Sequence, residues 1–168
     1  MVVYQFMRTY TKNFEQKLPI SLNTAWDFFS SPLNLSKITP KSMDFIITSD
    51  YTAQTKMYAG MIITYKVSPV LGIKMNWVTE ITHVSEGEYF IDEQRFGPFA
   101  FWHHEHHFKS IDGGVLMTDK LIYSVPFGVI GQVANALVVE KQTNDIFNYR
   151  ETAVEEMFGR YINTNSIF

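Results

Sequence analysis

The chain has 168 residues, of which 46% are hydrophobic, 15% aromatic and 18% charged, and its formal net charge is −3 at pH 7. This length fits one domain, and a weak negative charge with no run of Lys or Arg argues against nucleic acid or an anionic membrane as a partner. The absence of cysteine excludes disulfides, thiolate metal sites and cysteine nucleophiles.

The chain begins without the basic region and long apolar core of a secretion signal, and no run of residues is long enough for a membrane span. We therefore expect a cytoplasmic protein without stable membrane insertion. One domain should cover residues 1–168, with a core over about 4–160 and a polar tail over 161–168.

The first elements are an edge strand and two small helices. Tyr4 to Ile20 mixes β-branched and aromatic residues, as extended chains do. Ser21 can cap a helix over Leu22 to Phe29, and prolines bracket a second short helix over Leu33 to Ile38.

Six further runs have the composition of strands and end in turn residues. Most of the connections are short enough for hairpins, so the runs predict an antiparallel meander. These runs are Met43 to Thr48, Met61 to Ser68, Ile73 to Thr82, Glu88 to Phe96, Phe101 to Lys109 and Val115 to Ser124.

A long helix is expected from Val129 to Phe158, ended by Gly159. At roughly 100° per residue, most of its apolar side chains share one broad face, in which Thr143 and Arg150 are the polar exceptions. The residues expected on this face are Ala136, Val139, Thr143, Ile146, Phe147, Ala153, Val154 and Met157.

This order of elements predicts an α+β helix-grip fold. A curled antiparallel sheet of about seven strands would surround the long C-terminal helix, with two short helices after the first strand. A sheet that curls around one helix rarely closes along its whole length, so a cavity between helix and sheet is expected.

The start of the long helix is apolar on a second face as well, formed by Ile130, Val133, Ala134, Leu137 and Val138. A homodimer through the Ile130 to Val138 segment would cover this face. The small helices or the loop from Ser49 to Gly60 would do so equally well.

Four of the five histidines lie in one predicted strand, within FIDEQRFGPFAFWHHEHHF. Because side chains alternate along a strand, Trp102, His104, His106 and Phe108 share one face, which the apolar ends mark as the inner one. His103, Glu105 and His107 share the other face.

Buried histidines need partners, and neighbouring elements offer several. The preceding strand carries Asp92 and Gln94, and the following strand carries Asp119. Asp119 can hold a histidine in one tautomer, while Arg150 on the helix can bind the acid group of a ligand or pair with Asp92.

The segments DEQRFGPFAFWHHEHHF, GGVLMTDKLIYSVPFG and IFNYR resemble the SRPBCC superfamily, also called START-like or polyketide-cyclase-like, in its small stand-alone bacterial members. The resemblance covers most of the chain and implies a helix-grip fold with a deep apolar cavity. Members of the superfamily include lipid and hormone carriers and aromatase/cyclases. The positions that carry over are Gln94, Gly97, Pro98, Trp102, His104, His106, Asp119, Tyr123 and Arg150.

None of these positions has a universal catalytic role in the superfamily. Thr143 stands where the resemblance implies a larger apolar residue, commonly leucine, which would enlarge the cavity.

We therefore expect the protein to bind a small hydrophobic or amphipathic molecule, without a cofactor. The expected ligand-binding residues are Gln94, Trp102, His104, His106, Asp119, Tyr123, Thr143, Phe147 and Arg150. Two alternatives remain open. His104, His106 and Asp119 can support the acid–base chemistry of a cyclase, dehydratase or hydrolase, or can form a polar cluster that only fixes strand register.

A metal site is a further alternative, because cupins present metal ligands as His-x-His on a strand. Neither the glycine spacing nor the strand order fits a cupin, so the sequence predicts no metal site. His103, Glu105 and His107 on the outer face can still bind zinc adventitiously.

Overall fold

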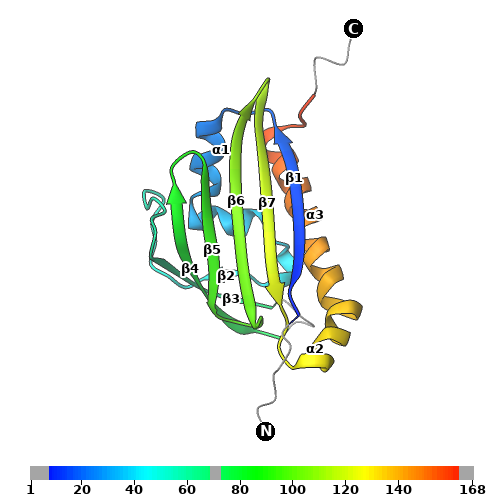
Figure 1. Cartoon of the computed structure of the whole chain (residues 1–168). Helices are drawn as coiled ribbons and strands as arrows, with labels where there is room; N and C mark the ends of the chain where they lie inside the picture. Colours follow the sequence, from blue (N-terminus) through cyan, green and yellow to red (C-terminus); the bar gives the residue numbers. More distant parts are fainter. Residues whose placement is uncertain (1–7, 69–72, 163–168) are drawn as a thin grey trace.

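The computed structural model describes residues 8–68 and 73–162. Its strands form one antiparallel sheet in the order β1-β7-β6-β5-β4-β3-β2, so the first strand pairs with the last at one edge of the sheet (Figure 1). The strands are β1 (Tyr10–Leu18), β2 (Ile46–Ile47), β3 (Met61–Val67), β4 (Met75–Ser85), β5 (Tyr89–Phe96), β6 (Phe101–Ile111) and β7 (Gly114–Ser124).

Helices follow the first strand and the last. The first group is α1 (Leu22–Phe29) and two 3₁₀ helices, η1 (Pro32–Ile38) and η2 (Lys41–Met43). The second group is one continuous rod made of α2 (Gly128–Ala134), a π-helical turn η3 (Asn135–Val139) and α3 (Glu140–Phe158). No helix among the described residues has the length and apolar character needed to cross a bilayer.

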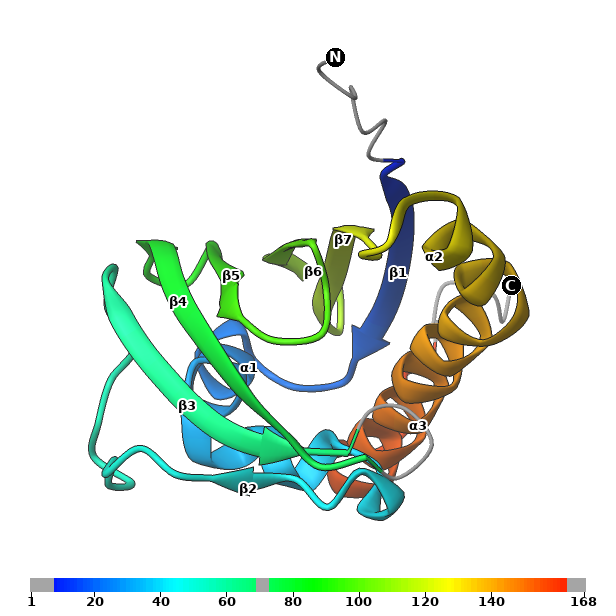
Figure 2. The same ribbon diagram turned by 90° about the horizontal axis from the view of Figure 1, so that it is seen from below.

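The sheet curls, and α2 and α3 lie beside its β1 edge (Figure 2). Lys12 Nζ on β1 pairs with Glu140 Oε1 at 2.6 Å, and Gln16 Nε2 donates to the Glu151 carbonyl at 2.9 Å. These contacts hold the edge strand to α3. The structure confirms the helix-grip architecture, the edge position of the first strand and the antiparallel meander from β2 to β7.

The core lies between the concave face of the sheet, α1 and α3. On strand β7, buried and half-buried residues alternate, so every second side chain points into this core. The largest fully buried apolar side chains are Leu18, Met61, Val67, Ile81, Val115, Met117, Leu121, Tyr123 and Val154.

Two predicted strands are shorter in the structure. The first covers Tyr10–Leu18, and residues 4–7 of the predicted run lie outside the described residues. The run from Met43 to Thr48 pairs only at Ile46–Ile47. Asp44 has a φ of 46°, a left-handed conformation that ends the one-turn helix η2 and interrupts an extended chain.

The long helix is not uniform, and this changes its buried face. The π-helical turn η3 inserts a wider turn, so Asn135 is buried and Ala136, expected on that face, is exposed. Met157, also expected there, is 40% exposed. It lies roughly 60° around the helix from the buried Val154, at the margin of the buried face.

The second apolar face of the helix stays exposed. The exposed fractions of Val129, Ile130, Val133 and Leu137 are 75%, 77%, 55% and 72%. Neither the small helices nor the loop over residues 49–60 covers this face, so the homodimer stays a prediction.

Candidate functional site

Strand pairing brings four ionisable side chains together on the inner face of the sheet. In the register of β5 and β6, Asp92 lies opposite His104. In the register of β6 and β7, His106 lies opposite Asp119. Since side chains i and i+2 of a strand share a face, both pairs point the same way. The burial of His104, His106 and Phe108 confirms that the even-numbered residues of this stretch face inward.

The four side chains form a closed ring in which each histidine lies between the two aspartates. His104 Nε2 is 2.9 Å from Asp119 Oδ1, and His104 Nδ1 is 3.3 Å from Asp92 Oδ2. His106 Nε2 is 2.8 Å from Asp92 Oδ2. His106 Nδ1 lies 2.8 Å from Asp119 Oδ1, although the groups are not aligned for a hydrogen bond.

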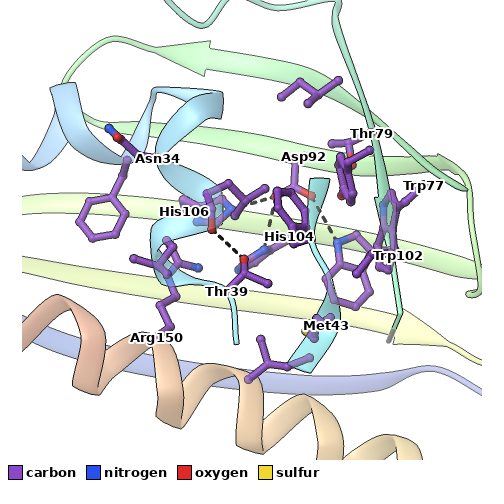
Figure 3. Close-up of a pocket in the computed structure, with 18 of the residues that line it drawn as sticks. Asn34, Thr39, Met43, Trp77, Thr79, Asp92, Trp102, His104, His106 and Arg150 are labelled. Carbon is purple, nitrogen blue, oxygen red and sulfur yellow. Dashed lines mark hydrogen bonds and ion pairs between the residues drawn. The ribbon is translucent and has the colours of Figure 1, made fainter. Parts of the chain in front are cut away.

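Two further residues hold the aspartates from outside this Asp–His ring. Trp102 Nε1 donates to Asp92 Oδ1 at 3.3 Å, as Figure 3 shows. Arg150 Nη1 on α3 donates to Asp119 Oδ1 at 3.4 Å. Arg150 therefore pairs with Asp119 and not with Asp92, the partner that the sequence suggested.

The charges in the ring follow from these contacts. Burial opposes ionisation of Asp92 and Asp119, but the histidines, together with Arg150 for Asp119, outweigh it, and the pKa of each carboxyl group lies below its ordinary value. Burial also opposes charge on His104. Its hydrogen bonds to Asp119 and Asp92 outweigh that effect and raise its pKa to about 9. At pH 7, His104 therefore carries positive charge between two carboxylates.

The ring forms part of the wall of a cavity of about 190 Å³ between the sheet, the small helices and α3. Asp92, His104, His106 and Arg150 line it. Figure 3 shows that residues after α1, such as Thr39 and Met43, lie across the cavity from strand residues such as Trp77. Most of the remaining wall is aromatic or aliphatic: Phe28, Phe29, Leu35, Ile38, Phe45, Met57, Ile63, Tyr65, Val67, Ile81, Phe90, Phe99, Val139, Ile146 and Phe147.

The outer face of β6 has a different character. His103 Nδ1 is 2.9 Å from Glu93 Oε1, and His107 Nε2 is 2.9 Å from Glu105 Oε2. Lys120 Nζ also donates to Glu105 at 2.9 Å. These pairs lie on the face of the sheet that points away from the cavity, so they form a separate group.

No family model matches this sequence, and no curated protein gives a significant match. Solved structures do. Protein CV1439 from Chromobacterium violaceum is similar with a TM-score of 0.66 and 12% identity, over 90% of this chain and 99% of that one. Major latex-like protein 151 from Panax ginseng is similar with a TM-score of 0.64 and 13% identity, over 89% and 97%. Protein Ms6760 from Mycobacterium smegmatis has a TM-score of 0.60 and 18% identity, over 88% and 92%. The chain has the helix-grip fold of these structures.

Six of the nine residues expected to bind a ligand line the cavity: Trp102, His104, His106, Thr143, Phe147 and Arg150. The other three do not. Gln94 Nε2 donates to the Phe99 carbonyl at 2.7 Å, and the Phe99 N–H donates to Gln94 Oε1 at 3.2 Å, so this amide closes the β5–β6 hairpin.

Asp119 and Tyr123 lie behind the cavity wall. Asp119 contacts the sides of the histidine rings that face away from Asp92, and it lines a second hollow between β1 and α3. Tyr123 is fully buried on β7 and stacks on Tyr10 with ring centroids 5.4 Å apart. Both residues therefore support the cavity wall from the side of the neighbouring strands.

Asp92 completes the Asp–His ring but was not among the residues expected to bind a ligand. A sequence signal for Asp92 did exist: Asp92 and His104 stand six residues on either side of Pro98, so a hairpin centred on Pro98 places them opposite each other. The aromatic wall supplied by Phe29, Tyr65 and Trp77 left no such signal, because their approach depends on how the sheet curls.

Proposed function

We propose that this protein binds a small hydrophobic or amphipathic molecule in the cavity between its sheet and α3, and that it does so in the cytoplasm. The SRPBCC fold typically encloses a cavity for a hydrophobic ligand. Two features of this chain support the proposal, the wall of the cavity and a buried cation beside it.

The wall favours a compact, ring-sized ligand body. A cavity of about 190 Å³ is slightly larger than the ~150 Å³ engineered cavity that holds benzene. Trp77, Trp102 and Phe99 form one wall, with Trp77 and Trp102 in edge-to-face contact at 5.2 Å. Flat aromatic walls of this kind suit one or two fused rings or a short branched chain better than a long acyl chain.

The observation that carries the proposal is Arg150. It is only 9% exposed, and its guanidinium carbon lies 5.4 Å from the Phe29 ring centroid and 5.9 Å from that of Phe147. One long hydrogen bond to Asp119 uses one of its donors, and its Nε has no hydrogen-bond partner in the described part of the chain. A buried donor without a partner is costly. A ligand carboxylate, phosphate or hydroxyl would satisfy it, so Arg150, with His104 and His106, would hold the polar end of the ligand.

Mass spectrometry of the protein isolated under native conditions from its own host tests the proposal directly. The expected result is a bound molecule of small mass with an apolar body and one acidic or hydroxyl group. Protein that carries no such molecule and binds none of the probes below would contradict the proposal.

A matched pair of probes isolates the role of Arg150. Naphthalene-2-carboxylate and 2-methylnaphthalene have similar ring bodies and differ in the acid group. Arg150→Met keeps a long side chain but removes the guanidinium, and Lys141→Met removes an exposed cation from the same helix as a control. A hydrogen bond to a charged group is worth about 1.5–3 kcal/mol, so Arg150→Met should weaken binding of the carboxylate roughly 10- to 150-fold. Binding of 2-methylnaphthalene should change little, and Lys141→Met should affect neither probe.

A further inference from the structure

The first observation concerns three ligand atoms on the cavity wall. One nitrogen of His104, one nitrogen of His106 and one carboxylate oxygen of Asp92 all lie within 4.8 Å of one another. The Asp92 oxygen is 3.3 Å from His104 Nδ1 and 2.8 Å from His106 Nε2. Ligand atoms about 2.1 Å from a shared Zn²⁺ lie roughly 3.0–3.4 Å apart, so a small displacement of these side chains would accommodate an ion.

The second observation is the orientation of the ligands. Histidines that bind a metal nearly always give their other ring nitrogen to a carboxylate, a carbonyl or water. Here His104 Nε2 is hydrogen-bonded to Asp119 Oδ1, and His106 Nδ1 lies beside the same oxygen. Trp102 holds the second oxygen of Asp92. His104 and Asp92 thus each have a hydrogen-bond partner that orients them, while His106 has only the nearby Asp119 oxygen beside its second nitrogen.

The third observation is which side of the histidine rings suits an ion. Each histidine has one ring nitrogen beside Asp92 Oδ2, on the cavity side, and the other beside Asp119 Oδ1. The side of Asp119 is less suitable for an ion, because Arg150 already places positive charge there.

We propose that Asp92, His104 and His106 form a binding site for a divalent transition metal, Zn²⁺ or Fe²⁺, in the cavity wall. Two imidazoles with one carboxylate suit these ions better than Mg²⁺ or Ca²⁺, which prefer oxygen ligands. All three residues line the cavity, so coordination positions remain open toward it. A bound ion would offer those positions to water or to the polar end of a cavity ligand. The His-x-His pattern alone supplies two of these ligands. The third, Asp92, comes from the neighbouring strand β5.

The test uses full-length protein without a histidine tag, stripped with a chelator and titrated with Zn²⁺ and with Co²⁺ in the absence of any organic ligand. One equivalent should bind. Asp92→Asn and His104→Ala should each weaken Zn²⁺ binding by more than about 100-fold, because even the loss of an outer-shell partner costs 10- to 100-fold. The control is His103→Asn/His107→Asn, which removes only the outer-face histidines and should bind like the wild type.

A wild type that binds no Zn²⁺ in competition with a weak chelator would overturn the proposal, and so would loss of binding in the outer-face control. Circular dichroism would show whether each variant folds. If the cavity variants do not fold, X-ray absorption on wild-type protein loaded with Zn²⁺ identifies the ligands of the ion instead. Two imidazoles and a carboxylate at about 2.0–2.2 Å are expected, and oxygen ligands alone would contradict the site. The naphthalene probes do not enter this titration, so the metal site and the ligand cavity can fail separately.

Discussion

The buried pair of Asp119 and Arg150 gives the sharpest test of how the site is held together. Their side chains are 4% and 10% exposed, and the shortest N–O distance is 3.4 Å. At that distance an effective dielectric constant of about 20 gives an attraction of roughly 5 kcal/mol, before the cost of removing both groups from water. Asp119→Asn keeps the shape of the side chain but leaves Arg150 buried without its counter-charge. We expect it to lower the free energy of unfolding by about 3–5 kcal/mol, as measured by urea denaturation.

A double-mutant cycle separates this pair from the rest of the ring. Arg150→Met should cost less, about 1–3 kcal/mol, since His104 and His106 still contact Asp119. The double variant should lose less than the sum of the two single variants, by roughly 1–3 kcal/mol, because residues in contact are not independent.

The control is Asp145→Asn. Asp145 pairs with Lys141 at 2.7 Å, but the two side chains are 56% and 78% exposed, so the change should stay within about 0.5 kcal/mol. The reasoning is refuted if Asp119→Asn costs less than about 1 kcal/mol, or if the cycle is additive within error.

Three further predictions follow from other parts of the fold. Ser21→Ala removes the side chain that accepts the Thr24 N–H at 3.1 Å and should lower stability by about 1 kcal/mol in urea denaturation; an unchanged midpoint would show that α1 needs no cap. Thr143→Leu places a larger apolar side chain in the cavity wall and should weaken binding of 2-methylnaphthalene several-fold, whereas equal binding would place the ligand elsewhere. We expect wild-type protein to dimerise through the Ile130 to Val138 segment, in which Ile130, Val133 and Leu137 are exposed, so that Leu137→Lys is monomeric in light scattering; a strictly monomeric wild type contradicts this.

The strands from Met61 onward could be predicted because each carries its own local signal. Alternating side chains fix which face is buried, and turns such as Asp112-Gly113-Gly114 end one strand and start the next. Because hairpins join strands that are consecutive in the sequence, the order of strands from β3 to β7 follows from the order of the chain. The same alternation predicted that His104 and His106 point inward, since Trp102 and Phe108 share their face.

Features that depend on tertiary contacts could not be predicted in this way. The π-helical turn η3 cannot be detected from hydrophobic periodicity, because the sequence around it is apolar on all sides. The predicted buried position was therefore Ala136, whereas the observed one is Asn135. The partner of Arg150 depended on where α3 crosses the sheet. The helix lies beside the β1 edge, where β7 is the next strand and β5 is two strands further away, and Asp119 is therefore the carboxylate within reach.

Strand register alone does not account for the Asp–His ring. Gln94 already fixes the β5–β6 hairpin through two hydrogen bonds to Phe99, on the same two strands that pair Asp92 with His104. Buried ionic groups can often be replaced by apolar residues of similar volume without loss of stability, so a fold that needed only register had a simpler solution available. Three of the four ring members instead open onto a cavity, beside an arginine with donors to spare. This placement allows the ring to contact a molecule or ion inside the cavity, and it therefore favours a role in binding a metal ion, the polar end of a ligand, or both together.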